Sequence, residues 1–84
     1  MTGSSTKARV VVTLKTGVLD PQGKAIEGAL RSLGIDGVGS VRQGKVFDIE
    51  LGAVAPDVAK KTLSEACERL LANTVIENFS IDLA

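Results

Sequence analysis

Two polar segments hold most of the side chains that could bind a ligand or a partner: Asp20-Pro21-Gln22-Gly23-Lys24 and Arg42-Gln43-Gly44-Lys45. The first indicates a helix start, because Asp20 can cap a helix and Pro21 suits its first position. That role leaves Gly23 unexplained, since glycine inside a helix costs about 1 kcal/mol relative to alanine. Close approach of a partner's backbone would explain it. The second segment indicates a solvated hairpin tip, whose two cations could instead hold an acidic patch or a phosphate.

Catalytic chemistry finds little support in the sequence. There is no histidine, the commonest general base, and one cysteine, Cys67, which has no such base to activate it and is expected in the core. A single cysteine also excludes an internal disulfide and a thiolate zinc site. Nothing places two of the candidate acid–base carboxylates in one pocket: Glu27, Asp48, Glu50 and Glu77. The glycines form neither common nucleotide-binding pattern. We predict no catalytic residue, cofactor or metal site in this chain.

Composition narrows the class of protein further. Ten basic and ten acidic residues cancel, so no basic surface argues for nucleic acid. Hydrophobic residues make up 44%, too many for a disordered chain, yet no apolar run is long enough to span a membrane. A lone cysteine suits a reducing, cytoplasmic location. We expect a flexible tail over residues 1–6 and one domain over residues 7–84.

Hydrophobic periodicity predicts six elements. Residues 8–15 form a strand with Val10, Val12 and Leu14 toward the core. A helix over residues 21–33 carries an apolar stripe, and Gly34 follows it as a left-handed cap that lets Ile35 contact Leu30. A hairpin joins residues 39–42 to 45–51, with Gly44 supplying a positive φ, although a bulged turn would shift the register. A second helix begins at Pro56 with the stripe Ala59, Leu63, Ala66, Cys67 and Leu70, and Leu71 at its edge. Residues 75–83 form the last strand.

The order strand-helix-strand-strand-helix-strand predicts an α+β, ferredoxin-like fold, with both helices on one face of a four-stranded antiparallel sheet. The other face would be unusually apolar for a monomer. Scattered surface valines are common, but this pattern favours burial against another subunit. The candidates for self-association are Val11, Val41, Val46 and Ile76.

Three segments together resemble the PurS family, the small subunit of phosphoribosylformylglycinamidine synthase. They are Val18 to Gly23, Val41 to Leu51 and Leu71 to Phe79, in the family's order, and the resemblance covers residues 7–84. The family often has proline where this chain has Thr74 and tyrosine where it has Phe79. These departures loosen a turn and remove a hydroxyl, and leave the main motifs intact.

The resemblance implies a role in de novo purine synthesis. The family's complex converts formylglycinamide ribonucleotide, glutamine and ATP into formylglycinamidine ribonucleotide. A glutaminase subunit releases ammonia and a large synthetase subunit, expected to hold ATP and magnesium, uses it. The small subunit is a non-catalytic partner, expected to assemble the other two, to assist ammonia transfer and to form a homodimer or homotetramer. The candidate partner-facing residues are Asp20, Gln22, Gly23, Lys24, Arg42, Gln43 and Lys45.

Three other classes are weighed against this one. An ACT-like regulatory domain has the same strand order and would bind an amino acid between subunits. A small ferredoxin-like enzyme such as an acylphosphatase needs an arginine in a phosphate cradle, and no matching loop follows the first strand. An RNA-binding module is disfavoured because the central strands lack stacking aromatics.

Overall fold

The strand β1 (Thr6–Leu14) lies at the centre of a three-stranded antiparallel sheet in the computed structural model, which describes residues 5–83. β2 (Gly44–Leu51) and β3 (Glu77–Leu83) flank it, giving the order β2-β1-β3. As the alternation predicted, Val10 and Val12 are fully buried on one face. The α+β class is confirmed, with three strands rather than four.

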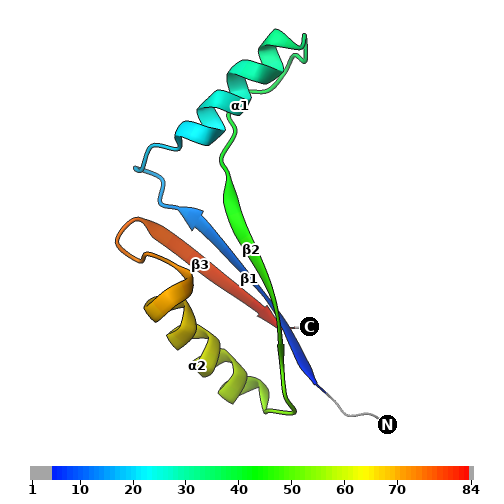
Figure 1. Ribbon diagram of the computed structural model, residues 1–84, viewed down its shortest axis with the longest axis vertical. Helices are drawn as coiled ribbons and strands as arrows, with labels where there is room; N and C mark the ends of the chain where they lie inside the picture. The colour runs from blue at the N-terminus through cyan, green and yellow to red at the C-terminus, as the bar shows by residue number, and fades with distance from the viewer. Residues whose placement is uncertain (1–4, 84) are drawn as a thin grey trace.

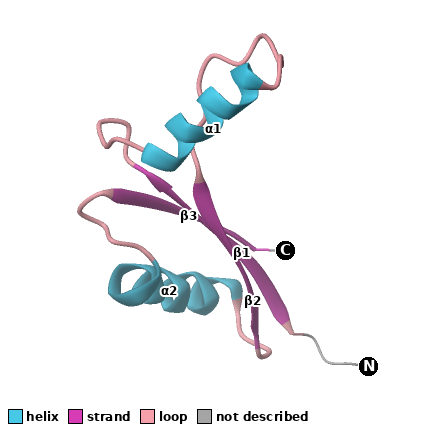
Figure 2. Cartoon of the chain, turned by 45° about the horizontal axis from the view of Figure 1, so that its top comes forward, coloured by secondary structure: helices cyan, strands magenta, loops and turns pink. Residues whose placement is uncertain are grey.

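The helix α2 (Pro56–Ala66) and the π-helical turn η1 (Cys67–Leu71) cover that buried face, as Figures 1 and 2 show. Proline occupies the first position of α2, as predicted. A tight core forms where helix and sheet meet, and Phe47, Ile49, Leu71, Phe79 and Ile81 pack around it. Its fully buried side chains are Val10, Val12, Leu63 and Cys67.

The predicted hairpin is wrong. Residues 35–43 form no strand, and residues 41–43 run directly into β2 at Gly44. The glycines with positive φ in the described chain are Gly34 and Gly37, so Gly44 makes no tight turn. Gly44 is required for space instead, because a Cβ there would lie 2.6 Å from the carbonyl oxygen of Val12. A glycine that allows close backbone approach has the same sequence appearance as one that makes a turn.

The helix α1 (Pro21–Ser32) forms as predicted but does not cover the sheet. Gly34 has φ +78°, and the N–H of Ile35 donates to the carbonyl of Leu30 at 3.0 Å, the predicted Schellman ending. The turn after β1 carries α1 beyond the end of the sheet, and residues 35–43 return beside it (Figures 1 and 2). The expected position of both helices on one sheet face is therefore wrong. We call residues 21–43 the arm.

The arm gives the described chain an elongated shape. Its extents are 51 × 32 × 15 Å and its radius of gyration is 16.8 Å, against about 12 Å for a compact chain of this length. The predicted apolar stripe of α1 does not reach a core, since Ile26 is 40% exposed and Leu33 is 74% exposed. Much of the apolar surface of the arm is thus not buried within the described chain.

Element boundaries differ from the prediction at both ends. Residues 1–4 and 84 lie outside the described residues, and of the predicted tail Thr6 is already the first residue of β1. β3 starts at Glu77, so the predicted strand residues Val75 and Ile76 lie in the preceding turn. Within residues 5–83, no helix has the length and hydropathy to cross a membrane.

Candidate functional site

The two polar segments singled out in the sequence meet at the base of the arm. Asp20 caps α1 through Oδ1, which accepts from the backbone N–H of Gly23 at 2.9 Å. Its other oxygen, Oδ2, accepts from the backbone N–H of Gln43 at 2.6 Å. One buried carboxylate therefore starts the helix and holds the chain that enters β2. We call this region, formed by Asp20, Gly23 and Glu27 against Val41 and Gln43, the joint.

Glu27 supplies a second carboxylate to the same segment. Its Oε2 accepts from the backbone N–H of Val41 at 2.9 Å, and only 5% of the residue is exposed. Lys24 lies one helical turn away and its Nζ is 3.5 Å from the other carboxylate oxygen. The Glu27 carboxylate therefore accepts the hydrogen bond from the Val41 N–H that a carbonyl of a neighbouring strand would otherwise accept. The sequence analysis weighed Glu27 only as an acid or base and missed this role, although Glu27 and Gly23 are spaced to share one helix face.

Gly23 is required by close approach, as the sequence suggested, but the backbone that approaches belongs to the same chain. A Cβ at Gly23 would collide with the carbonyl oxygen of Val41 and would lie 2.7 Å from Oδ2 of Asp20. The residue is buried within the joint. Glycine destabilises the first turn of α1 relative to alanine, and the close contact with the backbone of Val41 that glycine permits offsets this destabilisation.

The charged form of each joint carboxylate is favoured by backbone donors. The N–H of Gln43, followed by that of Gly23, lowers the pKa of Asp20 despite the opposing effect of desolvation, and Arg42 adds a smaller electrostatic contribution. The N–H of Val41 similarly lowers the pKa of Glu27, with help from Lys24 and Arg31. Both groups are therefore ionised at neutral pH and engaged in holding the backbone.

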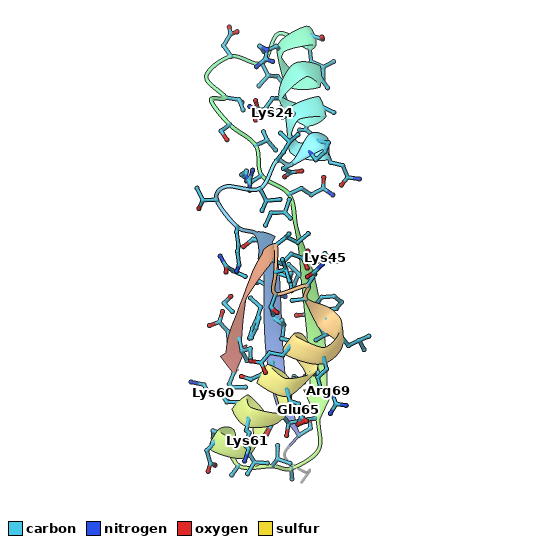
Figure 3. All side chains as sticks on the ribbon, turned by 90° about the vertical axis from the view of Figure 1, so that its left-hand side faces the viewer. Lys24, Lys45, Lys60, Lys61, Glu65 and Arg69 are labelled. Atoms are coloured by element: carbon cyan, nitrogen blue, oxygen red, sulfur yellow. The ribbon has the colours of Figure 1, made fainter. Side chains whose placement is uncertain are left out.

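The remaining candidates lie exposed around the joint. Arg42 Nη2 donates to the carbonyl of Lys15 at 3.0 Å, and Lys45 Nζ lies 3.8 Å from a carboxylate oxygen of Glu77. Figure 3 places Lys24 on the arm and Lys45 where the sheet begins, far from Lys60 and Lys61 on α2. A cavity of about 150 Å³ at this position is lined by residues of both segments and of β1 and β3: Val12, Leu14, Asp20, Gln22, Gln43, Gly44, Lys45 and Glu77.

A larger, open depression of about 630 Å³ lies at the other end of the sheet. Two ion pairs join β1 to β2 along it, and in the closer one Arg9 donates from Nε to Asp48 Oδ1 at 2.8 Å and from Nη2 to Oδ2 at 3.3 Å. Hydrogen bonding from Arg9 lowers the pKa of Asp48. Such paired groups stabilise the sheet surface without offering a free acid, base or nucleophile.

The four self-association candidates do not form one patch. Val11 and Val46 are direct cross-strand partners, and Val46 is 57% exposed. Val41 lies beyond the sheet in the joint, and Ile76 lies in the turn before β3. The sequence analysis placed Val41 and Val46 on one face because it assumed a hairpin. In a continuous extended segment, residues five apart point to opposite faces.

Cys67 is buried in the core, as expected from the sequence. Desolvation raises the pKa of its thiol, with a smaller contribution from Glu68. The thiolate is therefore a minor species at neutral pH, which agrees with a packing role.

Comparisons with known proteins agree with this geometry. Residues 7–84 match the family model described as PurS: Phosphoribosylformylglycinamidine (FGAM) synthase. The Mycobacterium leprae PurS subunit is 48% identical over 89% of this chain and 91% of its own, and the Synechocystis subunit is 45% identical over 89% and 75%. The crystal structure of Methanocaldococcus jannaschii PurS has a TM-score of 0.85 and 38% identity, covering 94% and 95% of the two chains. A chain in the structure of PurLQS from Thermotoga maritima has a TM-score of 0.88 and 31% identity, covering 96% and 99%.

Proposed function

Because the chain belongs to the PurS family of phosphoribosylformylglycinamidine synthase subunits, in purine biosynthesis, we propose that it joins the glutaminase and synthetase subunits of that enzyme. In this role it has no catalytic residues of its own and assists the transfer of ammonia between its partners. The synthetase subunit holds ATP and magnesium, and the complex works in the cytoplasm. The observation that carries the proposal is the strong fold match to a chain of PurLQS from Thermotoga maritima.

The candidate partner-facing residues fall into two groups, according to whether they are buried in the joint or exposed around it. Asp20 and Gly23 are buried and hold the chain itself, so their first contribution is to the shape of the arm. The exposed members are free to meet the larger subunits: Gln22, Lys24, Arg42, Gln43 and Lys45. We propose that this second group docks, and that the first group positions it.

The exposed lysines allow a test with a matched control. In a complex reconstituted from the three subunits, Lys24→Gln with Lys45→Gln should weaken assembly and lower glutamine-dependent synthesis. Lys60→Gln with Lys61→Gln removes two cations from the outer side of α2 (Figure 3) and should have little effect. Glutamine keeps the aliphatic stem of each side chain, so packing is largely preserved.

A comparison of glutamine-dependent with ammonia-dependent synthesis distinguishes a docking defect from a loss of active synthetase. Synthesis from added ammonia does not need a glutaminase joined to the synthetase, so the Lys24/Lys45 variant should retain more of this activity than of the glutamine-dependent one. Equal activity of both double variants at limiting small subunit would contradict docking through these lysines. Lys24 and Lys45 are themselves exposed, and Glu27 keeps the hydrogen bond from the N–H of Val41 when Lys24 is replaced, so the described fold should persist in the variant.

We also propose that the chain self-associates. Several large apolar side chains are mostly exposed in the described residues, among them Leu33, Leu70 and Val75. The elongated shape leaves the arm without a core of its own. Sedimentation of the purified chain at micromolar concentration should show at least a dimer, and a monomer across that range would overturn this part of the proposal.

A further inference from the structure

Asp36 and Gly37 form the one aspartate–glycine pair of the sequence, in the segment that follows the end of α1 (Figure 1). Both residues are exposed. Gly37 has φ +91°, a conformation that residues with a side chain rarely adopt. The course of the loop itself therefore requires glycine directly after this aspartate.

The loop that contains this pair is fixed at its two ends. The N–H of Ile35 donates to the carbonyl of Leu30 at 3.0 Å, and the N–H of Val41 donates to Glu27 at 2.9 Å. Residues 36–40 lie between these two contacts and belong to no helix or strand. Because such segments open at little cost in free energy, they sample conformations that a helix or a strand excludes.

The two groups of the pair that could react with each other are both free. Within residues 5–83, the carboxylate of Asp36 makes no ion pair or hydrogen bond, and the N–H of Gly37 donates to no acceptor. A Cβ built on Gly37 would have nothing within 4 Å, so the space beside its nitrogen is open. Neither group is held away from the other by a competing contact.

These groups are placed to close a ring. The backbone nitrogen of Gly37 attacks Cγ of Asp36, a C–N bond forms, and the amide proton and the carboxyl hydroxyl leave together as water. The product is a cyclic imide, a succinimide. An amide nitrogen is a weak nucleophile because its lone pair is delocalised into the carbonyl group, so the step depends on proximity and on an unhindered nitrogen. Glycine, which has no Cβ, hinders this nitrogen least.

Water then reopens the ring at either of its two carbonyl carbons. Attack at Cγ breaks the new C–N bond and restores aspartate. Attack at the main-chain carbonyl carbon of Asp36 breaks the original peptide bond and leaves the chain running through Cβ and Cγ, which is isoaspartate. Since one water leaves and one enters, the product keeps the mass and the charge of the original residue and needs no enzyme or co-reactant.

The other aspartates of the described chain lack this combination. Asp20 precedes proline, which has no N–H to lose, and its carboxylate is buried and engaged. Asp48 and Asp82 lie in strands and Asp57 lies in the first turn of α2, each before a large aliphatic residue. A branched side chain shields the attacking nitrogen, and a regular backbone restricts its approach to Cγ. These four residues therefore serve as internal references for reactivity.

We propose that Asp36–Gly37 is a site of spontaneous isomerisation in the folded protein, where isoaspartate accumulates through a succinimide. Because the loop is free between its two fixed ends, it accommodates the added backbone carbon, and the modified chain keeps the contact between Val41 and Glu27. The site belongs to the arm itself and does not depend on the docking or the self-association proposed above.

Incubation of the full chain at neutral pH, in water labelled with heavy oxygen, tests the proposal. Mass spectrometry with backbone fragmentation should locate isoaspartate that carries the label at Asp36 and at none of the other aspartates. The same chain unfolded in guanidinium chloride gives the rate of an unrestrained pair. The folded chain should react at Asp36 within about threefold of that rate, since a loop with little opening cost offers little protection.

Two variants provide the controls. Asp36→Glu keeps the charge and lengthens the side chain, so the corresponding larger ring closes far less readily. Gly37→Asn introduces a residue that tolerates positive φ but adds a Cβ beside the nitrogen. Both variants should lose the labelled isoaspartate at position 36, with α2 and the sheet still formed by circular dichroism.

Three results would overturn the proposal. Isomerisation at Asp36 far slower in the folded than in the unfolded chain would show that the folded protein shields the pair. Isoaspartate forming equally fast at the reference aspartates would remove the role of the glycine and of the loop. Faster hydrogen exchange of the Val41 amide in the incubated chain than in the incubated Asp36→Glu variant would contradict accommodation within the loop.

Discussion

The Asp20 carboxylate and the backbone N–H of Gln43 are 2.6 Å apart, the shortest of the three carboxylate–backbone contacts in the joint. This contact ties the start of α1 to the residue that leads into β2. Glu27 repeats it two residues earlier, at Val41. The arm is therefore held by hydrogen bonds from the backbone N–H groups of Val41 and Gln43 to the carboxylates of Glu27 and Asp20. Substitution of these carboxylates should change the geometry of the arm and leave the hydrophobic core intact.

Removing the Asp20 carboxylate should loosen the joint without unfolding the sheet. Asp20→Ala deprives the N–H groups of Gly23 and Gln43 of their acceptor at once. Hydrogen exchange of these two amides should accelerate about tenfold or more, comparable to the loss of a helix cap. Asp57→Ala, at the exposed first turn of α2, is the matched control and should leave both amides unchanged. Unchanged protection in the Asp20 variant would mean that the contact does not hold the arm.

Two glycines of α1 should respond to alanine in opposite directions. Gly23→Ala places a Cβ against the carbonyl of Val41 and should cost more than about 3 kcal/mol or displace residues 41–43. Gly28→Ala has nothing within 4 Å of its new Cβ and should stabilise the chain by about 0.5–1 kcal/mol. Chemical denaturation of both variants compares the same substitution in the same helix. Stabilisation by both would show that Val41 does not approach α1 as described.

Acid should release the arm before it unfolds the core. The pKa values of Asp20 and Glu27 are lowered by backbone donors, so their contribution to stability is present above the ordinary carboxyl range and is lost as pH falls through the lowered values. The amide resonances of Val41 and Gln43 should therefore move below about pH 4.

Glu27→Gln separates the two contributions to this acid response. The variant keeps an oxygen that can accept from Val41 but removes the titration, so the acid shift at Val41 should shrink while that at Gln43 remains. If both amides keep their full acid shift in the variant, Glu27 is not the group that titrates at Val41.

Local signals predicted the ends of α1 correctly because they depend on neighbouring residues. Asp20 caps the helix, Pro21 opens it, and Gly34 and Ile35 close it, each acting within a turn of the end that it sets. The same reasoning predicted the buried alternation of Val10 and Val12 in β1. Such elements need little information from the rest of the chain.

The course of residues 35–43 could not be predicted in this way. Their position depends on Glu27 and Asp20, which lie far away in the sequence, and Gly44 gives the same signal for a turn as for close packing. The apolar stripe of α1 was misleading for a related reason. Periodicity shows that a face will be buried, but a subunit of an assembly can bury it against another chain.

The last prediction concerns the end of the second helix, where the π-helical turn η1 changes which residues face the core. The N–H of Ala72 donates to the carbonyl of Cys67 at 2.9 Å, a π-helical spacing that adds a residue to the turn. An uninterrupted α-helix would have directed Leu70 inward, three residues after Cys67. Instead Leu70 is 82% exposed, and Leu71 packs against the core.

Leu71→Ala should therefore cost about 2 kcal/mol of unfolding free energy, and Leu70→Ala less than about 0.5 kcal/mol. The two variants are matched in residue type and adjacent in sequence, so each controls for the other. Urea denaturation gives the two costs, and sedimentation at the same concentration shows whether either variant changes the association state. Because Leu70 is free to contact another chain, any effect of its truncation should appear in assembly rather than in folding. A larger unfolding cost for Leu70→Ala than for Leu71→Ala would mean that the helix continues without the π-helical turn.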